Sequence, residues 1–289
     1  STAAGWLPAA MGRAAYETVW EPLLRGKFGA SAPDISMAWL WARLHCRTAE
    51  LGYLDGGFAR LYEALAAAVQ AQGGRLVLGA EVRRIGPAAQ GAGGGLAVAW
   101  ALPAEAGTVE PYGAEPAPAR RPPAEVAVTT EGFDRVVSTL PTALTVRLTP
   151  DLPPEYAAAH PAPRALGAHC LVLALDRPLS DVYWIGVNEP DLPFLALIEH
   201  TRMVSPAAYG GRHLVYLGNY RPHDDPLFTM TADEVIAAFT PGIRRINPAF
   251  DPSWITGAWS FAAPFAQPVV TPDFARTIPG FDTPIPGLH

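Results

Sequence analysis

The sequence predicts an α+β protein, with helices and short strands in its first half and an antiparallel sheet in its second. Apolar and aromatic residues recur every three or four positions over residues 1–50, which is typical of amphipathic helices. After Pro150, strand-like segments follow one another without helices between them, and this order favours an antiparallel sheet. The chain has 289 residues, which is enough for one large domain or two modest ones.

Two helices are predicted in the opening 50 residues. The first carries apolar residues from Trp6 to Leu24, and we expect Gly26 and Gly29 to break it. The second runs from about Ser36 to Cys46. For the tryptophans we favour packing in a core over insertion into a membrane surface, the alternative that amphipathic helices offer.

A third helix is predicted directly after a glycine pair. Gly56 and Gly57 precede a segment with apolar residues at i, i+4, i+7 and i+8 from Leu61, and Gly73-Gly74 is typical of a helix end. Glycines before a helix let the backbone approach a ligand closely, and the helix amino terminus favours an anion. Short extended segments are expected at residues 76–78 and 82–85.

The remaining elements are predicted from apolar runs bounded by turn residues. In the middle of the chain we expect strands at 96–102, 126–130 and 135–139, a glycine-rich hairpin connection at 86–95 and a surface excursion at 103–124. In the second half we expect strands at 169–176, 182–187, 194–199, 212–220 and 254–264. Thr231, with Asp233 and Glu234, is predicted to begin a helix that extends to about Ile246.

The composition excludes several functional classes. Acidic residues outnumber basic ones 27 to 21, for a net charge of −6, so a nucleic-acid partner is not expected. Cys46 and Cys170 form neither a disulfide framework nor a metal-ligand spacing, which favours a cytoplasmic protein without a metal site. The sequence contains no P-loop, no G-x-S-x-G elbow and no apolar run long enough to span a membrane.

Four motifs occur in a fixed order along the chain. They are GYLDGGF (52–58) with Leu61 and Leu65; LVLGAEVRRI (76–85); DRVVSTLP (134–141); and Trp259 with Gln267-Pro268, Pro279-Gly280 and TPIPGL (283–288). As an ordered set they resemble the flavin-containing amine oxidase superfamily, which includes phytoene desaturase and protoporphyrinogen oxidase branches. The resemblance spans nearly the whole chain.

The resemblance implies a partial FAD-binding α/β domain that includes residues 51–145. Gly56 and Gly57 would approach the cofactor, the Val82 main chain would hold the FAD adenine, and the Thr139-Leu140-Pro141 turn would lie beside the flavin. A substrate domain would combine the helices of residues 1–50 with a sheet of six or seven antiparallel strands within 146–270. Residues 271–289 would lead into the family's last flavin-binding strand.

The sequence departs from the family pattern at two places. The family's dinucleotide fingerprint and its final flavin strand are absent, so we expect a central part of a flavoenzyme that binds FAD weakly or not at all by itself. Amine-oxidising members often carry a lysine in the first long substrate-domain strand, where this chain has Cys170. The one lysine of the chain, Lys27, lies far away in sequence.

These departures favour hydride transfer to FAD during desaturation or dehydrogenation of a small apolar substrate over simple amine oxidation. We assign no catalytic residue. We expect substrate contacts from Cys170, Tyr183, Trp184, Tyr220 and Trp259, because large aromatic side chains suit an apolar site. Three alternatives stay open: a non-enzymatic module that binds a hydrophobic ligand or a partner, self-association through an exposed FAD-domain face, and peripheral membrane contact through the opening helices.

Overall fold

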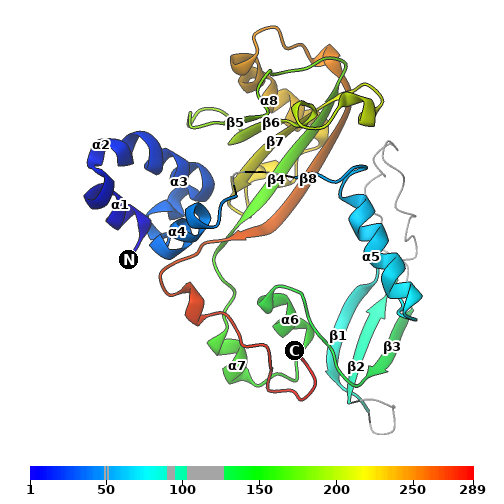
Figure 1. Ribbon diagram of the computed structural model, residues 1–289. Coiled ribbons are helices and arrows are strands. Elements are labelled where there is room, and N and C mark those ends of the chain that lie inside the picture. The colour runs from blue at the N-terminus through cyan, green and yellow to red at the C-terminus, as the bar shows by residue number, and fades with distance from the viewer. Residues whose placement is uncertain (49, 51, 90–94, 103–126) are drawn as a thin grey trace. The chain divides into compact units, whose positions relative to one another are not determined.

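The chain folds into two compact units, each built from two separate segments. The computed structural model describes residues 1–48, 50, 52–89, 95–102 and 127–289 (Figure 1). The first unit comprises Ser1–Phe58 and Pro163–Phe274, and the second comprises Ala59–Ala162 and Ala275–His289. Residues 146–162, which the sequence grouped with the sheet domain, therefore lie in the second unit. The expected excursion at 103–124 and most of the glycine run fall outside the described residues.

Helices open the first unit. They are α1 (Ala3–Met11), α2 (Arg13–Ala15), a π-helical turn at Tyr16–Trp20, α3 (Glu21–Phe28) and α4 (Met37–His45). The predicted break at Gly26 is wrong, because a single glycine only weakens a helix. The helix α3 continues through Gly26 and ends at Gly29, where φ is +55°.

The tryptophans of these helices divide between core and surface. Trp20 packs against the buried cluster that includes Leu7, Leu24 and Phe28, as expected. Trp6 and Trp41 are 47% and 56% exposed, so core packing is wrong for these two. In the part of the chain that the structure describes, no helix is long and apolar enough to cross a membrane.

A five-stranded antiparallel sheet forms the rest of the first unit, in the order β5-β6-β7-β4-β8 (Figure 1). The strands are β4 (Ala165–Leu175), β5 (Trp184–Gly186), β6 (Ala196–Glu199), β7 (His213–Arg221) and β8 (Ile255–Pro268). All five were predicted as segments, but the expected total of six or seven is too high for the described residues. The connections rich in Pro, Gly and Ser form turns and 3₁₀ helices instead of further strands.

Helix α8 (Ala232–Ile246) covers one face of this sheet. Its Val235, Phe239 and Ile243 are buried against strand residues such as Leu171 and Leu217. The predicted start is confirmed, since Thr231 and Glu234 form a capping box. The Thr231 hydrogen bonds also hold the pKa of the Glu234 carboxyl below its ordinary value.

A buried carboxylate fixes the end of β6. Glu199 is fully buried and accepts hydrogen bonds from the backbone amides of Leu179 and Ser180, at 3.0 and 3.3 Å. The hydroxyl of Thr201 donates a third at 2.7 Å. Because a buried carboxylate needs several donors, this network ties the loop before β5 to the core strand.

The second unit holds α5 (Ala59–Ala71), a three-stranded antiparallel sheet and two short helices. The sheet has the order β1-β2-β3, with β1 (Glu81–Pro87), β2 (Leu96–Ala101) and β3 (Val128–Phe133). The helices α6 (Thr142–Leu148) and α7 (Pro154–Ala159) follow.

The prediction of a strand at Leu76–Leu78 is wrong. No described strand pairs with this segment, and an extended segment becomes a strand only when a neighbour supplies hydrogen bonds. The three side chains are exposed, Leu78 by 75%. Helix α5 was predicted correctly, including its end at Gly73, yet none of its residues is buried.

The segment expected as a strand at 135–139 pairs with the last residues of the chain. Val136 forms a parallel bridge with Leu288. The Val136 amide donates to the Gly287 carbonyl at 2.9 Å, the His289 amide donates to the Val136 carbonyl at 2.9 Å, and the Ser138 amide donates to the His289 carbonyl at 2.8 Å. Two distant sequence motifs therefore meet in one pair of extended segments.

Replacing Gly287 by alanine should weaken this pairing. Gly287 has φ +84°, and an added Cβ would lie 2.9 Å from the Asp134 carbonyl oxygen. Strain of this kind typically lowers the free energy of unfolding by roughly 1–3 kcal/mol. Hydrogen exchange should show faster exchange at the Val136 and Ser138 amides, while Gly280→Ala, whose Cβ meets no described atom within 4 Å, should leave them protected. Equal protection in both variants would contradict the pairing.

Candidate functional site

Two adjoining pockets in the second unit are lined by residues from the second, third and fourth sequence motifs. The first pocket has a volume of about 340 Å³ and the second about 490 Å³, and Leu140 lines both. The first is lined by Val137, Ser138, Leu140, Thr142, Thr145, Val146, Tyr156, Pro279, Gly280, Phe281, Thr283 and His289. The second is lined by Ala80, Glu81, Val82, Arg83, Leu140, Leu144, Arg147 and Leu148. Both volumes are typical of sites that hold part of a cofactor or a small ligand.

Val82 and Leu140, from the second and third sequence motifs, line the second pocket together. Val82 pairs with Trp100, and the ladder shifts by one residue between Val82 and Arg84. A bulge of this kind leaves the extra residue, Arg83, outside the regular pairing, so its backbone groups can bind a ligand. Arg83 and Arg147 line this pocket together with Glu81, whose carboxylate lies 2.7 Å from the Arg83 guanidinium.

The first pocket combines hydroxyl groups with an apolar wall. The Ser138 and Thr145 hydroxyl oxygens lie 2.7 Å apart, so one donates to the other. Thr139 and Pro141 flank Leu140 in the chain, and Pro141 is the residue before α6. Hydroxyls beside an apolar surface suit a flat ring system, and Arg147 in the adjoining pocket could bind a phosphate, so the residues present fit part of an FAD.

The glycine pair of the first motif lies elsewhere in the fold. Gly56 and Gly57 belong to the first unit and line neither pocket. Their φ values are +82° and +81°, and the Gly57 amide donates to the Leu54 carbonyl at 2.8 Å. They form a tight turn before α5, and their contact with a cofactor stays a prediction.

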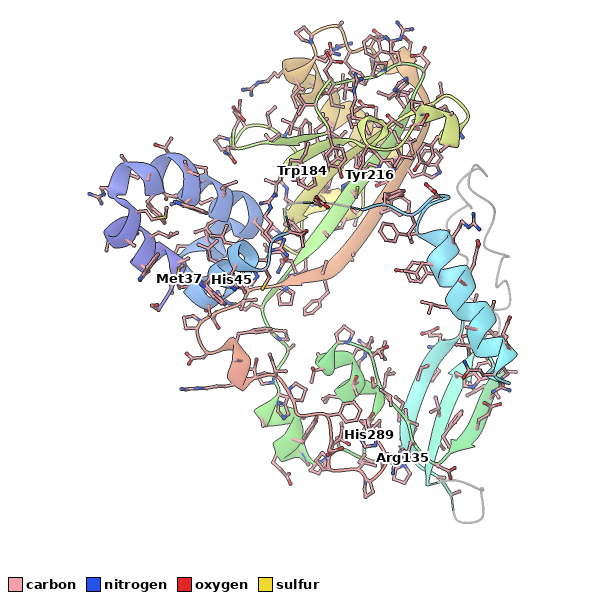
Figure 2. The ribbon with its side chains drawn as sticks, in the orientation of Figure 1. Met37, His45, Arg135, Trp184, Tyr216 and His289 are labelled. Atoms are coloured by element: carbon pink, nitrogen blue, oxygen red, sulfur yellow. The ribbon has the colours of Figure 1, made fainter. Side chains whose placement is uncertain are left out.

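The expected substrate residues gather on the five-stranded sheet, on the face opposite α8. Directly opposed residues of neighbouring strands share a face. The register joins Trp184, Ile198, Tyr216, Val172 and Trp259 in one row across all five strands. Figure 2 labels Trp184 and Tyr216, which both lie on this sheet. The row therefore carries three large aromatic side chains.

A row of small residues lies next to the aromatic row on the same face. Gly186, Ala196, Gly218 and Cys170 are paired across β5, β6, β7 and β4, and Phe261 follows on β8. A Cβ added at Gly186 or at Gly218 would meet no described atom within 4 Å. The space above these two glycines is open, and aromatic rings border it.

Tyr220 occupies the following row on this face, opposite Ala168. Four of the five expected substrate residues thus share the face opposite α8. The exception is Tyr183. Its carbonyl oxygen accepts a hydrogen bond from the Glu199 backbone amide, and strand alternation places its side chain on the other face of the sheet. Tyr216 was missed, although the alternation of Tyr216, Gly218 and Tyr220 in the sequence could have indicated it.

Cys170 is the titratable side chain of the small-residue row. Burial raises the pKa of its thiol above the ordinary value, so the thiol stays protonated at neutral pH. In the described ranges no group of three or more His, Cys, Asp or Glu residues could hold a metal ion. This face therefore offers apolar contacts and no charged acid or base on the sheet itself.

An aromatic cluster supports Tyr216 from beside the sheet. The ring of His200 lies 5.1 Å from that of Tyr53 and 5.5 Å from those of Tyr209 and Tyr216, between centroids. Its Nε2 atom lies 2.7 Å from the Tyr209 hydroxyl. Burial lowers the pKa of His200 below its ordinary value. The pKa of His169, which is buried against α8, is lowered for the same reason.

Stability should therefore fall when the pH drops below about 6.5, the ordinary pKa of histidine. In that range the unfolded chain binds protons at His169 and His200 that the folded chain does not bind. Urea titrations at a series of pH values should show this fall in the free energy of unfolding. His200→Phe should reduce the slope, whereas substitution of the exposed His45 should not. A slope unchanged in His200→Phe would show that His200 does not contribute.

Several solved structures are similar in fold to this chain. An oxidoreductase from Methanosarcina mazei aligns with a TM-score of 0.64 and 19% identity, over 100% of this chain and 62% of its own. A protoporphyrinogen oxidase-like protein from Exiguobacterium sp. 255-15 aligns with a TM-score of 0.65 and 13% identity, over 94% and 57%. A reduced UDP-galactopyranose mutase aligns with a TM-score of 0.62 and 14% identity, over 93% and 57%.

The chain spans about three-fifths of the length of these structures. No sequence among the curated proteins matches it. The family model of flavin-containing amine oxidoreductases matches residues 10–289. The chain therefore belongs to the flavin-containing amine oxidoreductase family.

Proposed function

We propose that this chain forms part of an FAD-dependent oxidoreductase that desaturates or dehydrogenates a small apolar substrate. The observation that carries the proposal is the sheet face opposite α8. There an aromatic row that includes Trp184 and Trp259 borders small residues with open space above them. Such a surface binds an apolar molecule by dispersion and by exclusion of water.

The chemistry would be divided between cofactor and protein. A flavin supplies the acceptor for a hydride when it is bound. The second-unit residues Val82, Thr139, Leu140 and Pro141 would hold part of it, and the sheet face of the first unit would orient and desolvate the substrate. Dehydrogenation removes a hydride, which the flavin would accept, and a proton. Because burial keeps the Cys170 thiol protonated, the proton would pass to solvent or to a base other than Cys170.

The residue type at position 170 bears on whether the reaction is amine oxidation or dehydrogenation. Amine-oxidising relatives often place a lysine at the equivalent position of the first long strand, and this chain has none there. We therefore favour carbon–carbon or carbon–oxygen dehydrogenation over amine oxidation.

An anaerobic flavin-reduction assay tests this preference. The chain would be supplied with saturating FAD and mixed with a panel of aliphatic and polyene compounds, or with a panel of primary and secondary amines. Loss of the oxidised flavin absorbance band with the apolar panel alone is expected. Loss with the amines alone would contradict the proposal.

A second candidate, a non-enzymatic module, is favoured by the exposed apolar side chains of the second unit. Helix α5 presents Leu61, Leu65 and Val69 to the outside, and Leu76–Leu78 lacks a described strand partner. A surface of this kind promotes association with a partner or a second copy. Sedimentation velocity should show self-association that Leu65→Glu abolishes; a monomer at all concentrations would exclude the second copy.

Peripheral membrane contact through the opening helices is a separate proposal. Trp6 and Trp41 are the exposed aromatic side chains that would enter the interface. Flotation with anionic vesicles tests it, and recovery of all protein in the bottom fraction would exclude it.

A further inference from the structure

The one lysine of the chain lies beside the proposed substrate face. Lys27 is in the last turn of α3, and its ammonium group lies 4.0 Å from the centroid of the Tyr220 ring. The Phe28 ring is 5.7 Å away. Tyr220 shares its sheet face with Cys170 and Trp259, so a positive charge stands at one end of an apolar surface.

In the described part of the chain, the Lys27 ammonium makes no ion pair with a carboxylate. Neighbouring cations of the first unit behave differently: Arg25 bonds Glu21 at 2.8 Å, Arg13 lies 3.1 Å from Glu17, and Arg164 bonds Asp34 at 2.7 Å. Lys27 is half-buried as a residue, and its ammonium lies over an aromatic ring. It would gain from an anionic partner that the protein itself does not supply.

We propose that Lys27 binds the carboxylate of a substrate whose remaining body is apolar and elongated. This inference rests on the proposed role of the sheet face as the substrate site. It adds the charged group of the substrate, a carboxylate, and the residue that binds this group, Lys27. Lys27 would act as a specificity-determining residue, because it contacts the end of the substrate and not the carbon that is oxidised.

The register of the sheet sets the length of the apolar body. Tyr220, Gly218 and Tyr216 lie on the same face of β7, two residues apart from one to the next. At the usual rise of a strand, the distance from Tyr220 to Tyr216 along β7 is about 13 Å. A carboxylate at Lys27 would therefore lay an extended chain across the small-residue row and end it at the aromatic row. The substrate class that fits is a linear aliphatic or polyene carboxylic acid.

Retinoate and retinol form a matched pair of probes for this site. They share a polyene body and differ at the head group, and both absorb light that tryptophan emits. Quenching of the intrinsic tryptophan emission then measures their dissociation constants, without FAD, on the whole chain. Three variants complete the design: Lys27→Met, Lys27→Arg and, as a control two residues away, Arg25→Gln.

The expected result is about tenfold tighter binding of retinoate than of retinol by the unaltered chain, a moderate charge-assisted preference. Lys27→Met should bring the ratio to about one, Lys27→Arg should restore it, and Arg25→Gln should leave it unchanged. No preference in the unaltered chain, no binding of either probe, or a preference that survives Lys27→Met would overturn the proposal. These outcomes do not depend on flavin reduction, so the failure of this proposal and of the proposed function can be told apart.

Discussion

Replacing Phe239 by alanine should lower the free energy of unfolding by about 3–5 kcal/mol, the usual loss for a buried phenylalanine. Phe239 is 1% exposed and contacts the rings of Phe194 and His169, at centroid distances of 5.6 and 6.2 Å. It lies at the centre of the contact between α8 and the sheet, so truncation leaves a cavity that few neighbours can fill. Urea denaturation followed by circular dichroism measures the loss.

Phe261→Ala is the matched control on the opposite face of the same sheet. Phe261 is 58% exposed, so its truncation should change the free energy of unfolding by less than about 1 kcal/mol. The pair of variants separates the face that stabilises the fold from the face that we assign to the substrate. Equal losses in both would show that the assignment of the two faces is wrong.

Gly218→Leu should weaken the binding of a polyene probe more than about tenfold while changing stability by less than about 1 kcal/mol. A side chain at Gly218 would enter the open space above the small-residue row, where an added Cβ meets no described atom within 4 Å. The new leucine would enter the space that we assign to the ligand. Retinol quenching of tryptophan emission measures the binding, and urea denaturation measures the stability.

Gly95→Leu provides the control for this variant. Gly95 also has open space around its position, but it belongs to the second unit and lies on no part of the five-stranded sheet. Its replacement should leave probe binding unchanged. Unchanged binding in Gly218→Leu would place the ligand elsewhere, and an equal loss in both variants would show that the effect is not local.

The elements with strong local patterns could be predicted from the sequence. Strand β4 ends in the continuous apolar run Cys170–Leu175, and α8 begins at a capping box whose residues, Thr231 and Glu234, have the expected spacing in the sequence. Leu76–Leu78 looked the same locally but is not a strand. A pattern shows that a segment can be extended, and it does not show whether a neighbouring segment will pair with it.

The candidate site could be predicted only in part, for similar reasons. Cys170, Trp184, Tyr220 and Trp259 share a face because strand alternation follows from sequence. Tyr183 directly precedes the short strand β5, and alternation places it on the other face. The approach of Lys27 to Tyr220 depends on how α3 packs against β7, which no local pattern encodes. The meeting of Val136 with Leu288 is likewise a long-range contact.

An NMR titration of the isotope-labelled chain with FAD tests whether the two pockets of the second unit bind the cofactor. We predict weak binding, with amide shifts concentrated at Val82, Arg83 and residues 138–140, which lie in or beside the two pockets. Leu140→Asp should abolish these shifts, because it introduces a charge into both pockets. Shifts confined to other parts of the chain, or shifts that persist in Leu140→Asp, would contradict the assignment of this site to the cofactor.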